Sequence, residues 1–103
     1  MRLIAKLSEY IEEELEGAEE YAKCALKHKD DHPTLAKTFH DMSNDEMRHV
    51  GLLHEEVVRL IEAHRREHGE PPAAMMAVWE YAHEKHIKAA AKIKVLQNEY
   101  KGM

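Results

Sequence analysis

Three residues in the middle of two long helical segments have side chains that could bind a metal ion. Glu14 belongs to a row of residues spaced alternately by three and four: Ile4, Leu7, Ile11, Glu14, Ala18, Tyr21 and Ala25. Glu46 and His49 are consecutive members of a second row that begins at Leu35. Such rows face the interior of a helical bundle, where a carboxylate needs a cationic side chain, water or a metal ion. Because neither row contains Lys or Arg, we expect a metal ion.

Glu14, Glu46 and His49 are expected to lie at the same height along two antiparallel helices. If the connection between the two segments is centred near residue 31, antiparallel neighbours have numbers that add up to about 62, which pairs Glu14 with both Glu46 and His49. A Glu-x-x-His pair is a weak signal, since about one or two occur by chance in this composition, and Glu80 and His83 form a second one. A partly hydrated, hydrogen-bonded cluster is the alternative. Mixed carboxylate and imidazole ligands suit iron or manganese, and zinc is also possible.

The segments that carry these residues read as three long helices. Hydrophobic residues make up 44% of the 103 residues and charged residues 34%, with only four Gly and three Pro. Breaks occur around Pro33 and again from Gly69 to Pro72, which predicts helices of about 2–28, 33–68 and 72–101. His32 or Asp31 is the expected cap before Pro33, and Gly69 the expected stop. Short connections make successive helices antiparallel, so we expect a single all-α domain, residues 1–103, folded as an up-down-up bundle.

Charge and hydropathy exclude several functional classes. The net charge is −5 and no basic block exists, which argues against nucleic acid as a partner. No apolar run approaches the eighteen or so residues of a membrane span. The single cysteine, Cys24, cannot form an internal disulfide. Charged residues appear too early in the chain for the apolar stretch of a signal peptide. We therefore expect a cytoplasmic protein that contacts neither membrane nor nucleic acid.

Two stretches of the chain resemble the ferritin-like di-iron carboxylate proteins, a superfamily that includes rubrerythrin, bacterioferritin and the small encapsulated ferritins. The first stretch runs from Glu14 to Tyr21, and the second covers Asp45 to His49, with Glu14 and Glu46 separated by 32 positions. The resemblance spans about residues 8–62. It implies a di-iron site that reacts with dioxygen or peroxide, with Glu14 as terminal or bridging carboxylate, Glu46 as bridging carboxylate and His49 as imidazole ligand. Tyr21 would be a neighbour of the site.

The chain departs from that family because it has three predicted helices in place of four. If the third helix runs back along the second, Glu46 and His49 face Val95 and Lys92, while Glu80 and His83 lie some 20 Å away. The other half of the site must then come from a second copy, and a two-fold axis would give four carboxylates and two imidazoles. We accordingly expect a ferritin-like half-bundle completed by dimerisation, forming a homodimer or a larger ring.

Other polar residues have less specific interpretations. Asp45 either orients the imidazole of His49 or is a solvated acid. Glu80 and His83 could form an extra metal site, but chance already accounts for the pair. His86 is expected to be a hydrogen-bonded core or interface histidine. The remaining histidines near helix ends, His28, His32, His64 and His68, are expected to have no function.

The sequence thus predicts a homo-oligomeric di-iron ferroxidase. Two alternatives stay open: a helical structural or adaptor protein on a ferritin-like scaffold without catalysis, and a zinc- or manganese-binding protein.

Overall fold

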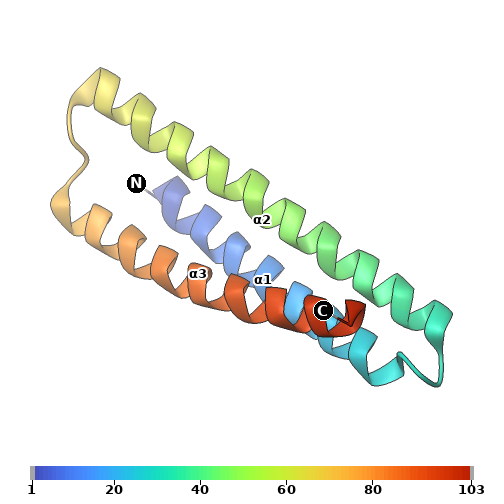
Figure 1. The fold of residues 1–103 in the computed structure, drawn as a ribbon. Coiled ribbons are helices and arrows are strands. Elements are labelled where there is room, and N and C mark those ends of the chain that lie inside the picture. Colours follow the sequence, from blue (N-terminus) through green and yellow to red (C-terminus); the bar gives the residue numbers. More distant parts are fainter. Residues whose placement is uncertain (1, 103) are drawn as a thin grey trace.

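The computed structural model describes residues 2–102, which form three long helices. These are α1 (Arg2–His28), α2 (Pro33–His68) and α3 (Ala73–Lys101), and their bounds agree with the predicted ranges to within one residue (Figure 1). The described residues include no strand. The 36 residues of α2 span about 54 Å at helical rise, close to the 56 Å length of the molecule. None of the three described helices is long and apolar enough to cross a membrane.

The residues around the two breaks determine where the helices end. Pro33 occupies the first turn of α2, where a missing N–H costs nothing, and His32 is the N-cap residue. The side chain of His32 makes no capping hydrogen bond. Gly69 has a φ of 81° and donates its N–H to the carbonyl of Arg65, which confirms it as the stop of α2.

The core forms where a row of small and branched residues on α1 packs against both other helices. It consists of Ile4, Ile11, Leu15 and Ala18 from α1, Val57 and Ile61 from α2, and Trp79 and Ile93 from α3. On α2, Val57 is buried whereas Glu56 is exposed and pairs with Arg59 at 2.7 Å. This outward rotation of Glu56 is expected, because a straight helix drifts away from a seven-residue repeat.

The third helix packs mainly against α1, along the side of α1 that carries Glu12, Leu15 and Glu19. Lys92 pairs with Glu19 at 2.9 Å, and His86 lies 3.9 Å from Glu12. The prediction that Val95 and Lys92 face Glu46 and His49 is therefore wrong: Val95 is 56% exposed. The reason is rotation, because Trp79, His86 and Ile93 turn the apolar side of α3 towards α1.

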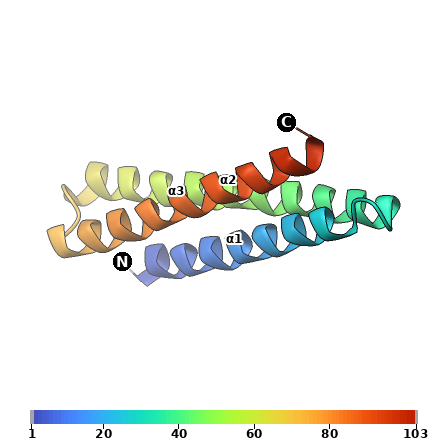
Figure 2. The ribbon, with the colours of Figure 1, turned by 60° about the horizontal axis from the view of Figure 1, so that its bottom comes forward.

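The contacts between α3 and α2 nevertheless occur at the expected depth along the helices. Gln97 of α3 is hydrogen-bonded to Ser43, and Tyr100 stacks on His40. Figure 2 shows α3 running over the pair formed by α1 and α2. Among residues 2–102, the ion pairs of Glu14, Glu46 and His49 involve only these three residues and no residue of α3.

Candidate metal centre

Glu14, Glu46 and His49 meet halfway along α1 and α2. His49 Nδ1 lies 3.3 Å from Glu14 Oε2 and 4.0 Å from Glu46 Oε1. Each residue offers one ligand atom, and these three atoms all lie within 4.8 Å of one another. The side chains are 29%, 25% and 40% exposed for Glu14, Glu46 and His49. The expected convergence at one level is therefore present, in a place reached by solvent from one side.

The carboxylates of Glu14 and Glu46 lie close enough together that ionisation of one disfavours ionisation of the other. A hydrogen bond with Glu14, together with burial and the negative charges of Glu14 and Asp45, raises the pKa of Glu46, while His49 lowers it. Among residues 2–102, neither Glu14 nor Glu46 pairs with Lys or Arg. The cluster consequently holds more negative charge than its surroundings neutralise, which is the condition under which a bound cation stabilises a site.

A hydrogen-bonded chain orients the imidazole of His49. With its proton on Nδ1, His49 donates to Glu14, and its Nε2 faces the guanidinium of Arg48, with Nη2 at 3.5 Å. The order of the chain is Arg48, His49, Glu14. Sequence reasoning missed Arg48, because a charged residue next to a ligand on an exposed helix face carries no distinctive signal.

Gly17 provides the space for the Glu46 carboxylate. A Cβ atom at position 17 would lie 3.3 Å from Glu46 Oε2 and 3.7 Å from its carboxyl carbon. Gly17 costs about 1 kcal/mol of helix stability relative to Ala. Gly51 has nothing within 4 Å of such an atom. Gly17 thus lets α2 bring a ligand carboxylate close to α1, whereas no contact of this kind explains Gly51.

A buried polar relay joins the three helices one turn from the site. Gln97 donates to Ser43 Oγ at 2.9 Å, and Ser43 donates to the backbone carbonyl of Ala18 at 2.7 Å. Ser43 is fully buried and Gln97 is 7% exposed. The relay fixes α2 against α1 within one turn of Glu46. Sequence reasoning did not include these residues. The available signal was Gln97, a polar residue next to Leu96 near the end of the apolar row of α3.

Tyr21 and Asp45, the two predicted neighbours of the site, lie in different environments. Tyr21 is half-buried and stacks on Phe39, with ring centroids 6.1 Å apart. Asp45 is exposed and acts on Glu46 through its charge. His49 is oriented by Glu14 and Arg48, so the orienting role proposed for Asp45 falls to those two residues.

The second Glu-x-x-His pair lies in a different environment. Glu80 is exposed, and His83 stacks on both His54 and Trp79, with ring centroids at 4.7 and 5.4 Å. Two groups of three or more potential ligands occur among residues 2–102, and Glu80 and His83 belong to neither. His86 is 6% exposed, and both of its ring nitrogens lack a hydrogen-bond partner. Burial lowers the pKa of His86.

A groove of about 280 Å³ lies between α1 and α3, away from the three ligands. Glu12, Glu19, Lys85 and His86 contribute to its lining, above a floor that includes Ile93. Glu14, Glu46 and His49 do not line this groove; they lie on the α1–α2 pair. Comparison with protein-family models, with curated proteins and with solved structures finds no match to this chain. The ferritin-like resemblance therefore rests on the motif residues alone.

The face that bears the ligands also carries apolar residues. Helical spacing places Leu3, Leu7, Tyr10 and Tyr21 on the same side of α1 as Glu14, and Leu35, Met42, Leu53 and Leu60 on the same side of α2 as Glu46. We call this set, with the three ligands and Gly17, the open face. Leu3, Tyr10 and Leu35 are 55%, 41% and 43% exposed. Leu3, Tyr10 and Leu35 are thus exposed hydrophobic side chains of this face, whereas Leu7, Leu53 and Leu60 pack against the core cluster.

Proposed function

We propose that two copies of this chain join through their open faces and bind a pair of iron ions between them, which they oxidise from Fe(II) to Fe(III) with dioxygen or peroxide. The observation that carries the proposal is the convergence of Glu14, Glu46 and His49, in which neither carboxylate pairs with Lys or Arg. Carboxylate oxygens with an imidazole nitrogen match the ligand preference of iron, and manganese and zinc are competitors.

A second copy is needed because one chain supplies only half of a di-iron ligand set. Glu80 and His83 do not reach the three ligands, since His83 is stacked on His54 and Trp79. A two-fold axis at the open face would bring together four carboxylates and two imidazoles. In this proposal the up-down-up three-helix unit is half of a ferritin-like bundle, and its partly exposed apolar residues form the dimer interface.

The residues of the open face would have distinct roles. Glu46, whose pKa is raised by Glu14, would release its proton when a cation binds, and His49 would bind the cation as a neutral imidazole through the ring nitrogen that carries no proton. Glu14, which lies on α1, would bind the same cation. When bound, two Fe(II) ions supply two electrons, enough with two protons to reduce one hydrogen peroxide to two waters. The single cysteine is in keeping with a cytoplasmic location.

Iron loading tests the metal site directly. Protein purified without a histidine tag is stripped of metal, loaded with Fe(II) without oxygen, and analysed for metal content and for anomalous scattering at the iron edge. We expect one iron per chain, in adjacent pairs ligated by Glu14, Glu46 and His49. Wild-type protein that remains free of iron overturns the proposal, and preferential retention of zinc or manganese changes the metal.

A pair of tyrosine variants tests the interface. Tyr10 lies on the open face, and Tyr81 lies on α3 and is 66% exposed. We expect light scattering to give at least twice the 12.0 kDa of one chain for wild type and Tyr81→Arg, and a monomer with weakened iron binding for Tyr10→Arg. An unchanged mass in Tyr10→Arg contradicts an interface at the open face.

A structural or adaptor role is the second candidate. It is favoured by exposed apolar side chains on α3, including Val78 at 67%, Tyr81 at 66% and Val95 at 56%. A metal-free monomer in both experiments supports the adaptor, whereas an iron-bearing oligomer supports the oxidase.

A further inference from the structure

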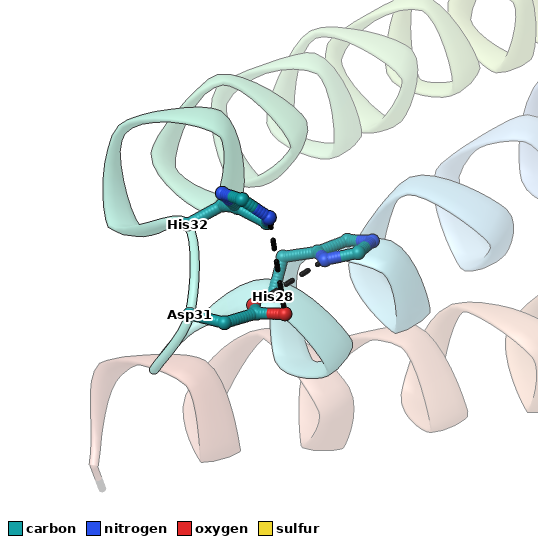
Figure 3. A group of neighbouring side chains, drawn as sticks. All are labelled: His28, Asp31 and His32. Carbon is teal, nitrogen blue, oxygen red and sulfur yellow. Dashed lines mark ion pairs between the residues drawn. The ribbon is translucent and has the colours of Figure 1, made fainter.

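The turn between α1 and α2 brings together two imidazoles and one carboxylate. His28 ends α1, Asp31 lies in the turn and His32 is the N-cap of α2. Figure 3 shows the Asp31 carboxylate directed towards both rings. We propose that His28, Asp31 and His32 form a second metal site, selective for Zn²⁺-like transition metals, which clamps the end of the α1–α2 pair.

The distances suit a tetrahedral ion. Asp31 Oδ1 lies 3.4 Å from His28 Nδ1, and Asp31 Oδ2 lies 4.0 Å from His32 Nε2. Ligand atoms about 2.0–2.2 Å from a tetrahedral zinc are separated by roughly 3.4 Å. One ligand atom from each residue lies within 4.8 Å of the other two. Only a small movement of the exposed His32 side chain is needed to close the site around an ion.

The backbone of the turn holds the ligands in place. The His32 N–H donates to the carbonyl of His28 at 2.9 Å, which sets the two rings side by side with centroids 5.7 Å apart. The ring of His28 also packs on Phe39, at 6.4 Å between centroids. The imidazole at the core of the site is therefore positioned before any metal arrives.

The potential ligand atoms are not engaged by stronger partners. His28 Nδ1 is buried and has no hydrogen-bond partner, and the His32 side chain makes no capping hydrogen bond. Within residues 2–102, the ion pairs of Asp31 are with His28 and His32 alone. The nearby cation Lys29 does not pair with Asp31; its ammonium lies over the ring of Tyr100, 5.7 Å from the ring centroid. A buried nitrogen that faces a carboxylate but makes no hydrogen bond is better satisfied by a cation shared with that carboxylate.

This ligand set differs from that of the open face. Two imidazoles and one carboxylate leave a fourth position for water, a common arrangement for zinc, whereas Glu14, Glu46 and His49 offer more oxygen. The sites are 14 residues apart on α1, roughly 21 Å at helical rise. The turn site is thus independent of the proposed iron chemistry. In this proposal His28 and His32 have a function that the sequence analysis did not assign to them.

Zinc titration of metal-stripped, untagged protein tests the proposal, with Co²⁺ absorption as a probe of four-coordinate geometry. The titrations use a Glu14→Gln/Glu46→Gln background, so that the open face cannot contribute. We expect one Zn²⁺ per chain, a zinc-dependent rise in Tm, and visible Co²⁺ bands. His32→Ala and Asp31→Asn change exposed side chains, and each should weaken zinc binding at least about tenfold.

His64 and His68 provide the matched control. They are also spaced by four residues near a helix end, with ring centroids 5.3 Å apart, but they belong to neither candidate metal group. His64→Ala/His68→Ala should bind zinc like the parent. The proposal is overturned by the absence of zinc binding in the parent, by unchanged affinity in His32→Ala and Asp31→Asn, or by an equal loss in the control.

Discussion

The two Glu-x-x-His pairs of this chain have the same spacing and opposite environments. Glu46 and His49 face a second carboxylate, Glu14, and the three side chains are 25–40% exposed. In the other pair, Glu80 is exposed and His83 is part of an aromatic stack with Trp79. The difference shows that the spacing has no fixed meaning: what decides its chemistry is the residue that the neighbouring helix places opposite.

Metal binding should separate the two pairs most strongly. Glu46→Gln removes a charged ligand and should weaken iron binding by at least about 100-fold, whereas Glu80→Gln should leave binding unchanged. Calorimetric titration of metal-stripped protein measures both. Equal losses in the two variants would show that the pairs are not functionally different.

Unfolding free energy should separate the histidines in the opposite direction. His83→Ala removes two ring contacts, at 4.7 and 5.4 Å, and should destabilise metal-free protein by about 1–2 kcal/mol. His49→Ala changes a side chain that is 40% exposed and should cost about 0.5 kcal/mol or less. Urea unfolding checks this, and a larger loss for His49→Ala would assign it a structural role.

The glycines sharpen the comparison at the backbone. Ala is favoured over Gly in a helix by about 1 kcal/mol, so Gly51→Ala, which meets no neighbour, should gain most of that. Gly17→Ala should gain less and bind iron about tenfold more weakly, because its Cβ displaces the Glu46 carboxylate. Thermal unfolding and metal titration test both variants; intact metal binding in Gly17→Ala would show that Glu46 adjusts without loss.

The smallest expected effect is the pH dependence of metal-free protein. Because the pKa of Glu46 is raised on folding, the folded state holds this proton more tightly, and stability falls as pH rises from the ordinary carboxyl range through the raised value. Glu46→Gln should remove that loss, so its advantage over wild type should grow with pH and then level off. Urea unfolding at several pH values, with Glu80→Gln as control, measures the difference. A constant difference at all pH values would show that Glu46 titrates normally.

Periodicity and punctuation in the sequence were sufficient for the helices and for the ligand trio. Pro33 and Gly69 have local conformational effects that act wherever the chain folds, and on α1 the alternating spacings of three and four identified the buried residues Ile4, Ile11, Ala18 and Ala25. On α2 the same rule was wrong, because no residue of the row that begins at Leu35 is buried; the buried side of α2 carries Ala36, His40, Ser43, Val57 and Ile61. The common level of Glu14, Glu46 and His49 followed from helical rise and a short turn. These features depend on neighbours within one or two helical turns, or on one connection of known length.

Tertiary structure alone decided the orientation of α3, the relay through Ser43 and the ligand group in the turn. A helix can rotate about its axis while keeping its depth, so the position opposite Glu46 could not be read from residue numbers, and Val95 points outwards. His28 and His32 become a possible metal site only because the turn places Asp31 between them. Side-chain packing fixes such rotations, and packing involves residues far apart in the sequence.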